Sequence, residues 1–225
     1  QKALQREWPI VVILVAYLAL GIVYGVVNPV FEAPDEPQHF FFVKHLADGK
    51  GLPVQSQSGK QAWAQEGSQP PLYYALAALI ISGVDTSDAE RLLWANPHVN
   101  MGVPLAQANK NVYIHTERER FPYRGTTLAV HLLRLFSTLM GAGTVLATYC
   151  TMRLAFPSQP ALAVGAAALN AFTPQFVFIH SAVNNDTLVT LLGSWAFWAM
   201  VRLWSRPLRW RTGLGLGLLI GGASL

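Results

Sequence analysis

The sequence has 225 residues, of which 52% are hydrophobic and only 12% are charged, and its mean hydropathy is +0.31. A soluble globular domain carries about 25% charged residues, so this composition argues against an ordinary soluble protein. The formal net charge is +4, but the basic residues are scattered between segments, which argues against nucleic-acid binding. The single cysteine, Cys150, excludes an internal disulfide and a cysteine-rich metal site.

The first predicted element is a membrane-spanning helix. No charged residue occurs in residues 8–31, and roughly 20 apolar residues span a bilayer core. A cleaved signal peptide is the alternative, since Lys2 and Arg6 would serve as its basic region. Signal sequences have an apolar core of about 7–15 residues, followed by a small-residue cleavage site. Neither feature fits, so residues 1–30 are interpreted as the first transmembrane helix.

Residues 31–127 are predicted to form one large external loop that carries juxtamembrane helices. Prolines and aromatic side chains recur in it, whereas disordered segments are poor in aromatic residues. Residues 38–48 are predicted to form an amphipathic helix, with Pro37 in its first turn and Gly49 after its end. Residues 72–82 are also apolar but too few to span a bilayer. We expect them to form a helix at the interface or against the bundle.

Residues 128–225 are predicted to hold transmembrane helices two to four and the start of a fifth. The spans are expected at 135–152, with an apolar lead-in from Leu128, within 161–181 and at 187–203, and a further apolar segment begins near Leu214. Because that segment is still apolar at Leu225, we expect the chain to be the N-terminal part of a longer protein. The predicted fold class is an all-α integral membrane protein, a polytopic helix bundle with a large external loop.

The basic residues predict the orientation in the membrane. With four full spans, Lys2, Arg6, Arg153 and the arginines from Arg202 to Arg211 fall on one side. The positive-inside rule assigns that side to the cytoplasm. We therefore expect a multi-pass protein of the inner (plasma) membrane, with a cytoplasmic N-terminus and an external loop.

An acidic pair, Asp35-Glu36, opens the loop directly after the first span. Pro34 and Pro37 restrict the backbone on both sides. A carboxylate here could act as a general base toward a hydroxyl, anchor a substrate amine or bind a metal. The alternative is a helix N-cap, which explains one carboxylate better than two. His39 could join Asp35 as a metal ligand or simply pack.

Polar residues elsewhere give further candidates. Asn185 and Asp186 follow the third predicted span on the outer side, where they could bind sugar hydroxyls or a cation. The alternative is that Asp186 only caps the next helix. Arg118, Arg120 and Arg124 could hold a lipid phosphate, and a solvated loop face is the alternative for them.

Several of these features together resemble a family of membrane glycosyltransferases. The features are a first span, an external loop that begins with Asp-Glu, and a later Pro-Pro-Leu helix. The sequences that carry them are APDEPQHF, QPPLYYALAALI and LLRLFSTLMGAGTVLATYCTMRLAFP. They are similar to GT-C glycosyltransferases, above all to glycosyltransferase family 39, which includes protein O-mannosyltransferases and aminoarabinose transferases. NKNVYIHT and SAVNNDTL more specifically resemble a bacterial branch.

The resemblance implies a GT-C-like fold and an inverting transfer of sugar from a polyprenyl-phosphate donor to an acceptor at the outer face of the membrane. It implies that Asp35 is the catalytic base and that Glu36 orients the acceptor. The residues expected to bind substrate are His39, Gln69, Arg124, Asn185 and Asp186. The relatives usually have Lys or His where Gln69 stands, and the loop is enlarged at 82–127, so the acceptor stays open.

The expected partners are membrane lipid and the lipid-linked sugar, and a divalent metal ion is a candidate cofactor. A non-catalytic GT-C-like subunit or scaffold of a larger membrane complex, with protein partners, is the alternative function. A transporter ranks third. Transporters tend to show paired polar residues within interrupted helices. The predicted spans lack central charges, and Thr173-Pro174-Gln175 is the one break within a span, so this pattern is weak here.

Overall fold

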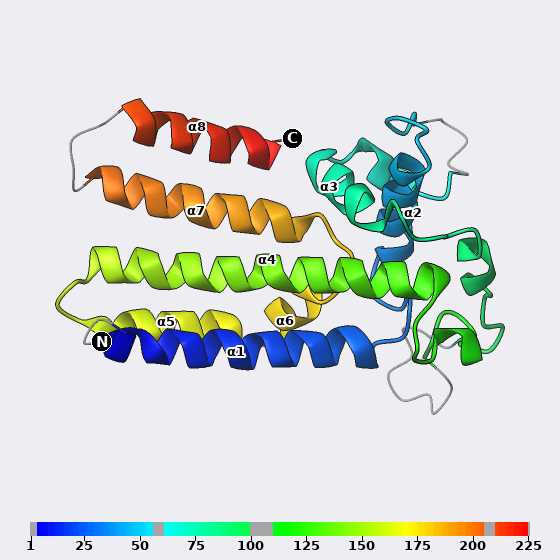
Figure 1. The fold of residues 1–225 in the computed structure, drawn as a ribbon, viewed down its shortest axis with the longest axis horizontal. Coiled ribbons are helices and arrows are strands. Elements are labelled where there is room, and N and C mark those ends of the chain that lie inside the picture. Colours follow the sequence, from blue (N-terminus) through cyan, green and yellow to red (C-terminus); the bar gives the residue numbers. More distant parts are fainter. Residues whose placement is uncertain (1–3, 56–60, 100–109, 205–209, 225) are drawn as a thin grey trace. The chain divides into compact units, whose positions relative to one another are not determined.

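The computed structural model describes residues 4–55, 61–99, 110–204 and 210–224, and within them the protein is helical (Figure 1). The α-helices are α1 (Leu4–Val27), α2 (Glu36–Ala47), α3 (Leu72–Ile81), α4 (Gly125–Ala155), α5 (Pro160–Ala171), α6 (Pro174–His180), α7 (Asp186–Trp204) and α8 (Trp210–Ser224). Three short 3-10 helices are η1 (Ala64–Ser68), η2 (Ala89–Leu92) and η3 (Glu117–Glu119). The all-α fold class predicted from the sequence is confirmed.

The chain divides into two compact units. Unit 1 consists of Gln1–Gly25, Pro70–Tyr73 and Arg134–Leu225, and unit 2 consists of Val26–Gln69 and Tyr74–Leu133. Unit 1 therefore holds most of the long apolar helices. The loop predicted at 31–127 falls in unit 2 except for Pro70–Tyr73.

Among the described residues, three helices are long and apolar enough to cross a membrane, namely α1, α4 and α7, and α5 with α6 makes a fourth if the bent pair is one span. The two helices of that pair meet at 62°, at the break that the sequence indicates. Pro174 has no N–H and disfavours a helical conformation at the residue before it. Thr173 is accordingly extended, with φ −69° and ψ 117°.

The core of unit 1 packs α1 against α4 and α5. The core residues are Ile10, Ile13 and Tyr17 of α1, Val145 and Tyr149 of α4, and Ala163, Ala167 and Ala171 of α5, with Val177 of α6. At one end Glu7 lies 3.6 Å from Arg153, and at the other Arg134 donates to the Gly25 carbonyl at 2.7 Å. These pairs make α1 and α4 antiparallel (Figure 1).

Gly141 sets the separation of α1 and α4, which gives a prediction for stability. A Cβ at this position would overlap the Tyr17 hydroxyl and lie 2.9 Å from a ring carbon of His180. We expect Gly141→Ala to lower the unfolding temperature in detergent, because overpacking costs about 1–3 kcal/mol. Tyr17→Phe removes the hydroxyl, which has no hydrogen-bond partner within the described residues, and should restore part of the loss. If the double variant lost as much unfolding temperature as the two single variants added together, the close approach of Gly141 and Tyr17 would be contradicted.

The predicted orientation can be tested with single cysteines. Ser87 in unit 2 and Ser158 between α4 and α5 are both exposed. In a Cys150→Ala background, we expect Ser87→Cys and Ser158→Cys to label from opposite sides of the membrane with an impermeant thiol reagent. Labelling from one side would refute the topology. Lys2, Arg206 and Arg209, which also support the orientation, lie outside the described residues.

In unit 2, α2 occurs where the sequence predicts a helix, but a single apolar stripe does not describe it. Phe40, Phe41, Phe42 and Val43, four successive residues, are all buried, whereas one apolar face of an amphipathic helix would bury only some of them. Phe31 packs on Phe40 and Phe41, with ring centroids 5.3 and 6.4 Å apart. The first half of α2 is therefore buried on more than one side, because Phe31, from the loop just before the helix, covers Phe40 and Phe41.

Candidate functional site

The loop before α2 holds Asp35 in an uncommon backbone conformation. Asp35 has φ 57° and ψ 4°, in the left-handed region, and Phe31 has φ 67°. Non-glycine residues rarely adopt these angles, although Asp tolerates them better than most. Asp35 stands at the N-cap position of α2, but its side chain is exposed and makes no capping hydrogen bond. The N-cap alternative therefore does not account for this carboxylate.

Glu36 points inward where Asp35 points outward. Its side chain is fully buried, and Oε2 accepts a hydrogen bond from the Phe31 N–H at 3.0 Å. Its own N–H donates to the Ala33 carbonyl at 3.2 Å. A buried carboxylate is costly unless it is hydrogen-bonded, so Glu36 braces the turn that carries Asp35. The expectation that Glu36 orients the acceptor stays a prediction.

His39 of α2 belongs to a buried polar cluster in unit 2. Its Nδ1 lies 2.8 Å from the Tyr74 hydroxyl and 3.7 Å from Glu66 Oε2, and its ring stacks on that of Tyr74. Glu66 lies in η1 and is buried. Sequence reasoning missed Glu66. Its one signal is that it is the sole acidic residue between Asp48 and Asp85.

A second polar cluster, the Glu32 clasp, ties the Asp35 loop to residues 112–119. Glu32 accepts hydrogen bonds from the N–H groups of Val112 and Tyr113, each at 2.9 Å. His115 Nε2 lies 2.9 Å from Glu32, and its Nδ1 lies 2.8 Å from Glu119. Burial, and then the Glu32 charge, raise the pKa of Tyr113 above its ordinary value. The clasp was not predicted from the sequence.

The remaining predicted residues of unit 2 lie near chain turns. Gln69 ends η1, and its N–H donates to the Glu66 carbonyl at 3.0 Å. It is half-buried, and it directly precedes Pro70. Arg124 is exposed and directly precedes α4. Gln69 therefore lies next to Glu66, to which its backbone is hydrogen-bonded, and Arg124 lies on the surface.

Asn185 and Asp186 belong to unit 1, at the start of α7. Asn185 is buried, whereas Asp186 is exposed. The side chain of Asn184 accepts the Asp186 N–H at 2.7 Å. One hydrogen bond at this helix start therefore comes from Asn184, and Asp186 is the first residue of α7. Both interpretations of Asp186, substrate binding and helix capping, stay predictions.

The residues that the structure describes contain no group of three or more His, Cys, Asp or Glu side chains arranged to hold a metal ion. His39 lies near one carboxylate, that of Glu66. His115 lies between two carboxylates, and these face opposite nitrogens of its ring. One ion could not replace both of those contacts. The divalent metal stays a prediction.

Within the described residues, these observations define an all-α chain with apolar helices long enough to cross a membrane and an exposed aspartate, Asp35, in the loop after the first of them. Residues 129–225 match the family model described as dolichyl-phosphate-mannose-protein mannosyltransferase. The resemblance to membrane glycosyltransferases is thereby confirmed over that part of the chain, from α4 to α8. Comparison with curated proteins and with solved structures gave no match. The matched part includes Asn185 and Asp186 but not Asp35, Glu36 or His39.

Proposed function

We propose that the protein transfers a sugar from a polyprenyl-phosphate donor to an acceptor at the outer face of the membrane. The family match supports a glycosyltransferase that uses a lipid-linked sugar, because the family's description names a dolichyl-phosphate sugar. The geometry of Asp35 is the observation that carries the catalytic part of the proposal. Asp35 combines an uncommon backbone conformation with an exposed side chain that makes no capping hydrogen bond, and such conformations gather at functional sites.

Asp35 is proposed as the general base. It would take the proton from an acceptor hydroxyl as that oxygen attacks the anomeric carbon of the donor sugar. The bond from the anomeric carbon to the lipid phosphate oxygen breaks, the phosphate leaves with the electron pair, and the configuration inverts. Positioning matters because small displacements of a reacting group reduce the rate strongly.

The position of Asp35 along the chain suits a donor anchored in lipid. The apolar part of α1 ends at Val27, and Asp35 follows after a short turn. A lipid-linked sugar has its phosphate at the membrane surface, so the reacting carbon lies just above the headgroups. Gln69, Arg124, Asn185 and Asp186 are proposed to contact the substrates.

Glu36 and the Glu32 clasp are proposed as the supports of the base. Glu36 fixes the turn from inside, and Glu32, three residues before Asp35, fixes the same loop to residues 112–115. Supports of this kind are required because the catalytic group must hold its geometry without help from the substrate. The direct test is sugar transfer by the Asp35→Asn variant in membranes that contain the full chain.

A further inference from the structure

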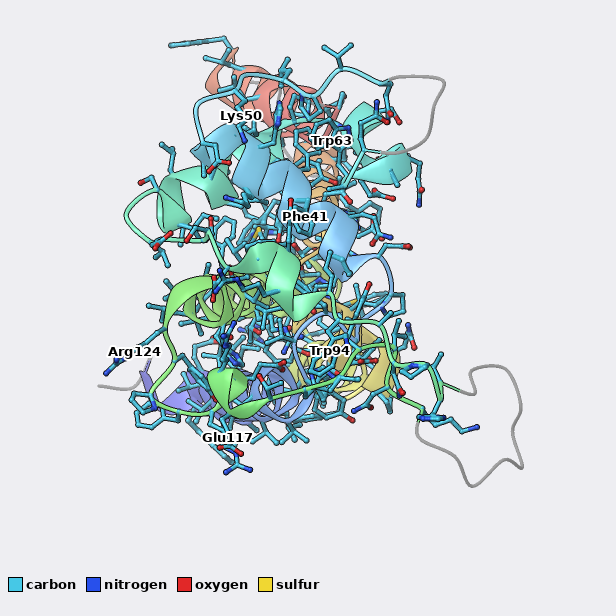
Figure 2. All side chains as sticks on the ribbon, turned by 90° about the vertical axis from the view of Figure 1, so that its right-hand side faces the viewer. Phe41, Lys50, Trp63, Trp94, Glu117 and Arg124 are labelled. Carbon is cyan, nitrogen blue, oxygen red and sulfur yellow. The ribbon has the colours of Figure 1, made fainter. Side chains whose placement is uncertain are left out.

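A surface pocket in unit 2 is lined by none of the residues to which the proposed function assigns a role. Its volume is about 660 Å³, and its lining residues are Glu90, Arg91, Trp94, Thr116, Glu117 and Arg118. Figure 2 shows two of them, Trp94 and Glu117, on the face of unit 2 that is turned to the viewer. Binding pockets for small ligands typically measure about 300–1,000 Å³, so the space suits a ligand of one or two sugar rings.

Backbone hydrogen bonds join the two walls of the pocket. The Ile114 N–H donates to the Trp94 carbonyl at 2.8 Å, and the Asn96 N–H donates to the Val112 carbonyl at 2.9 Å. Ala95 and Tyr113 form an antiparallel bridge between these contacts. The Trp94 wall and the Thr116–Arg118 wall are therefore fixed to one another before any ligand binds.

Each wall is also anchored from behind. The Asp88 carboxylate accepts hydrogen bonds from the Thr126 N–H at 3.0 Å and the Thr126 hydroxyl at 2.6 Å, which holds the start of η2 against the start of α4. On the other wall, His115 and Glu119 flank the lining residues and contact each other at 2.8 Å. The pocket is thus built on a braced framework.

The lining chemistry favours a carbohydrate. The Trp94 side chain is 59% exposed, although an indole gains by covering its apolar face and its N–H can still donate. Two glutamates and two arginines line the same pocket, so its lining includes both hydrogen-bond acceptors and donors and the formal charges of the lining residues cancel. Sugar rings need such a mixture, because they have one apolar face and a rim of hydroxyl groups. An anionic lipid headgroup would need an excess of positive charge.

We propose that this pocket binds a sugar unit of a carbohydrate acceptor. The acceptor role rests on the proposed function, whereas the binding of saccharide does not. The Glu32 clasp links this pocket to the loop of Asp35, because His115, next to the Thr116–Arg118 wall, contacts Glu32, three positions before Asp35. The contacts of Glu32 therefore connect the wall of the pocket with the loop that carries the proposed base.

The test begins with binding to an array of printed oligosaccharides by the purified full chain in detergent. The saccharide bound best is then titrated against the parent and its variants. We expect Trp94→Ala to weaken binding at least about tenfold, since aromatic anchors carry much of the binding energy in pockets. Trp94→Phe should be intermediate. Phe121→Ala is the matched control, because Phe121 is exposed in the same unit but is not among the residues that line the pocket. The affinity of this variant for the saccharide should equal that of the parent.

Two results would overturn the proposal. The first is that the array shows no saccharide bound, or that Trp94→Ala binds as the parent does. The second is that the chain binds only nanodiscs containing phosphatidylglycerol and loses this binding on Arg91→Gln, which would make the pocket a headgroup site. Asp35→Asn should bind saccharide normally, so a failure of the proposed catalysis and a failure of this site are distinguishable.

Discussion

Asp35→Asn is expected to reduce sugar transfer at least about a hundredfold, because removal of a general base typically costs about 10²–10⁴ in rate. Asparagine has nearly the same size as aspartate and is among the residues that tolerate left-handed backbone angles, so the turn at φ 57° should survive. No capping hydrogen bond is lost, since the Asp35 side chain makes none. The substitution therefore removes a proton acceptor and leaves the fold intact.

The measurement is incorporation of label from a radiolabelled polyprenyl-phosphate sugar, in membranes that contain equal amounts of each variant. Asp85→Asn is the matched control, because Asp85 is also exposed and its hydrogen bond from the Ser87 N–H can be kept by an amide oxygen. Glu36→Gln should be milder than Asp35→Asn, since the amide can still accept from Phe31. Parent-like transfer by Asp35→Asn would favour the non-catalytic subunit or scaffold instead.

The helices could be predicted from the sequence because their signals are local. A long uncharged run predicts α1, and the Pro70-Pro71 start predicts α3, which begins at Leu72. Pro174 likewise predicts the break between α5 and α6, although its 62° angle depends on packing. These features depend on neighbouring residues, so the sequence contains what is needed to find them.

The surroundings of the candidate base could not be predicted in the same way. Asp35 and Glu36 are adjacent and chemically alike, yet one is exposed and the other fully buried. Which of the two faces solvent depends on left-handed angles at Phe31 and Asp35, and composition does not reveal these. The partners of Glu32 lie about eighty positions away in an irregular segment, where no periodic pattern indicates which side chains meet.

Glu32→Gln is expected to open the clasp and to accelerate hydrogen exchange at the amides of Val112 and Tyr113. Both carboxylate oxygens of Glu32 accept a backbone N–H, and one also contacts His115. Glutamine has only one acceptor oxygen, so its NH₂ group must face one of the two N–H donors. A hydrogen bond to a charged group contributes about 1.5–3 kcal/mol, which corresponds to roughly tenfold to a hundredfold faster exchange when opening is local.

Glu119→Gln supplies the matched control, because among the contacts described Glu119 touches His115 and neither backbone amide. It should leave exchange at Val112 and Tyr113 close to that of the parent, as measured by hydrogen–deuterium exchange on the purified full chain. Sugar transfer by Glu32→Gln should fall as well, but less than for Asp35→Asn, since the base is displaced rather than removed. Equal exchange in Glu32→Gln and the parent would show that the carboxylate does not hold residues 112–113. The loop of Asp35 would then depend on Glu36 alone, and Glu36→Ala would have to produce the larger loss of transfer.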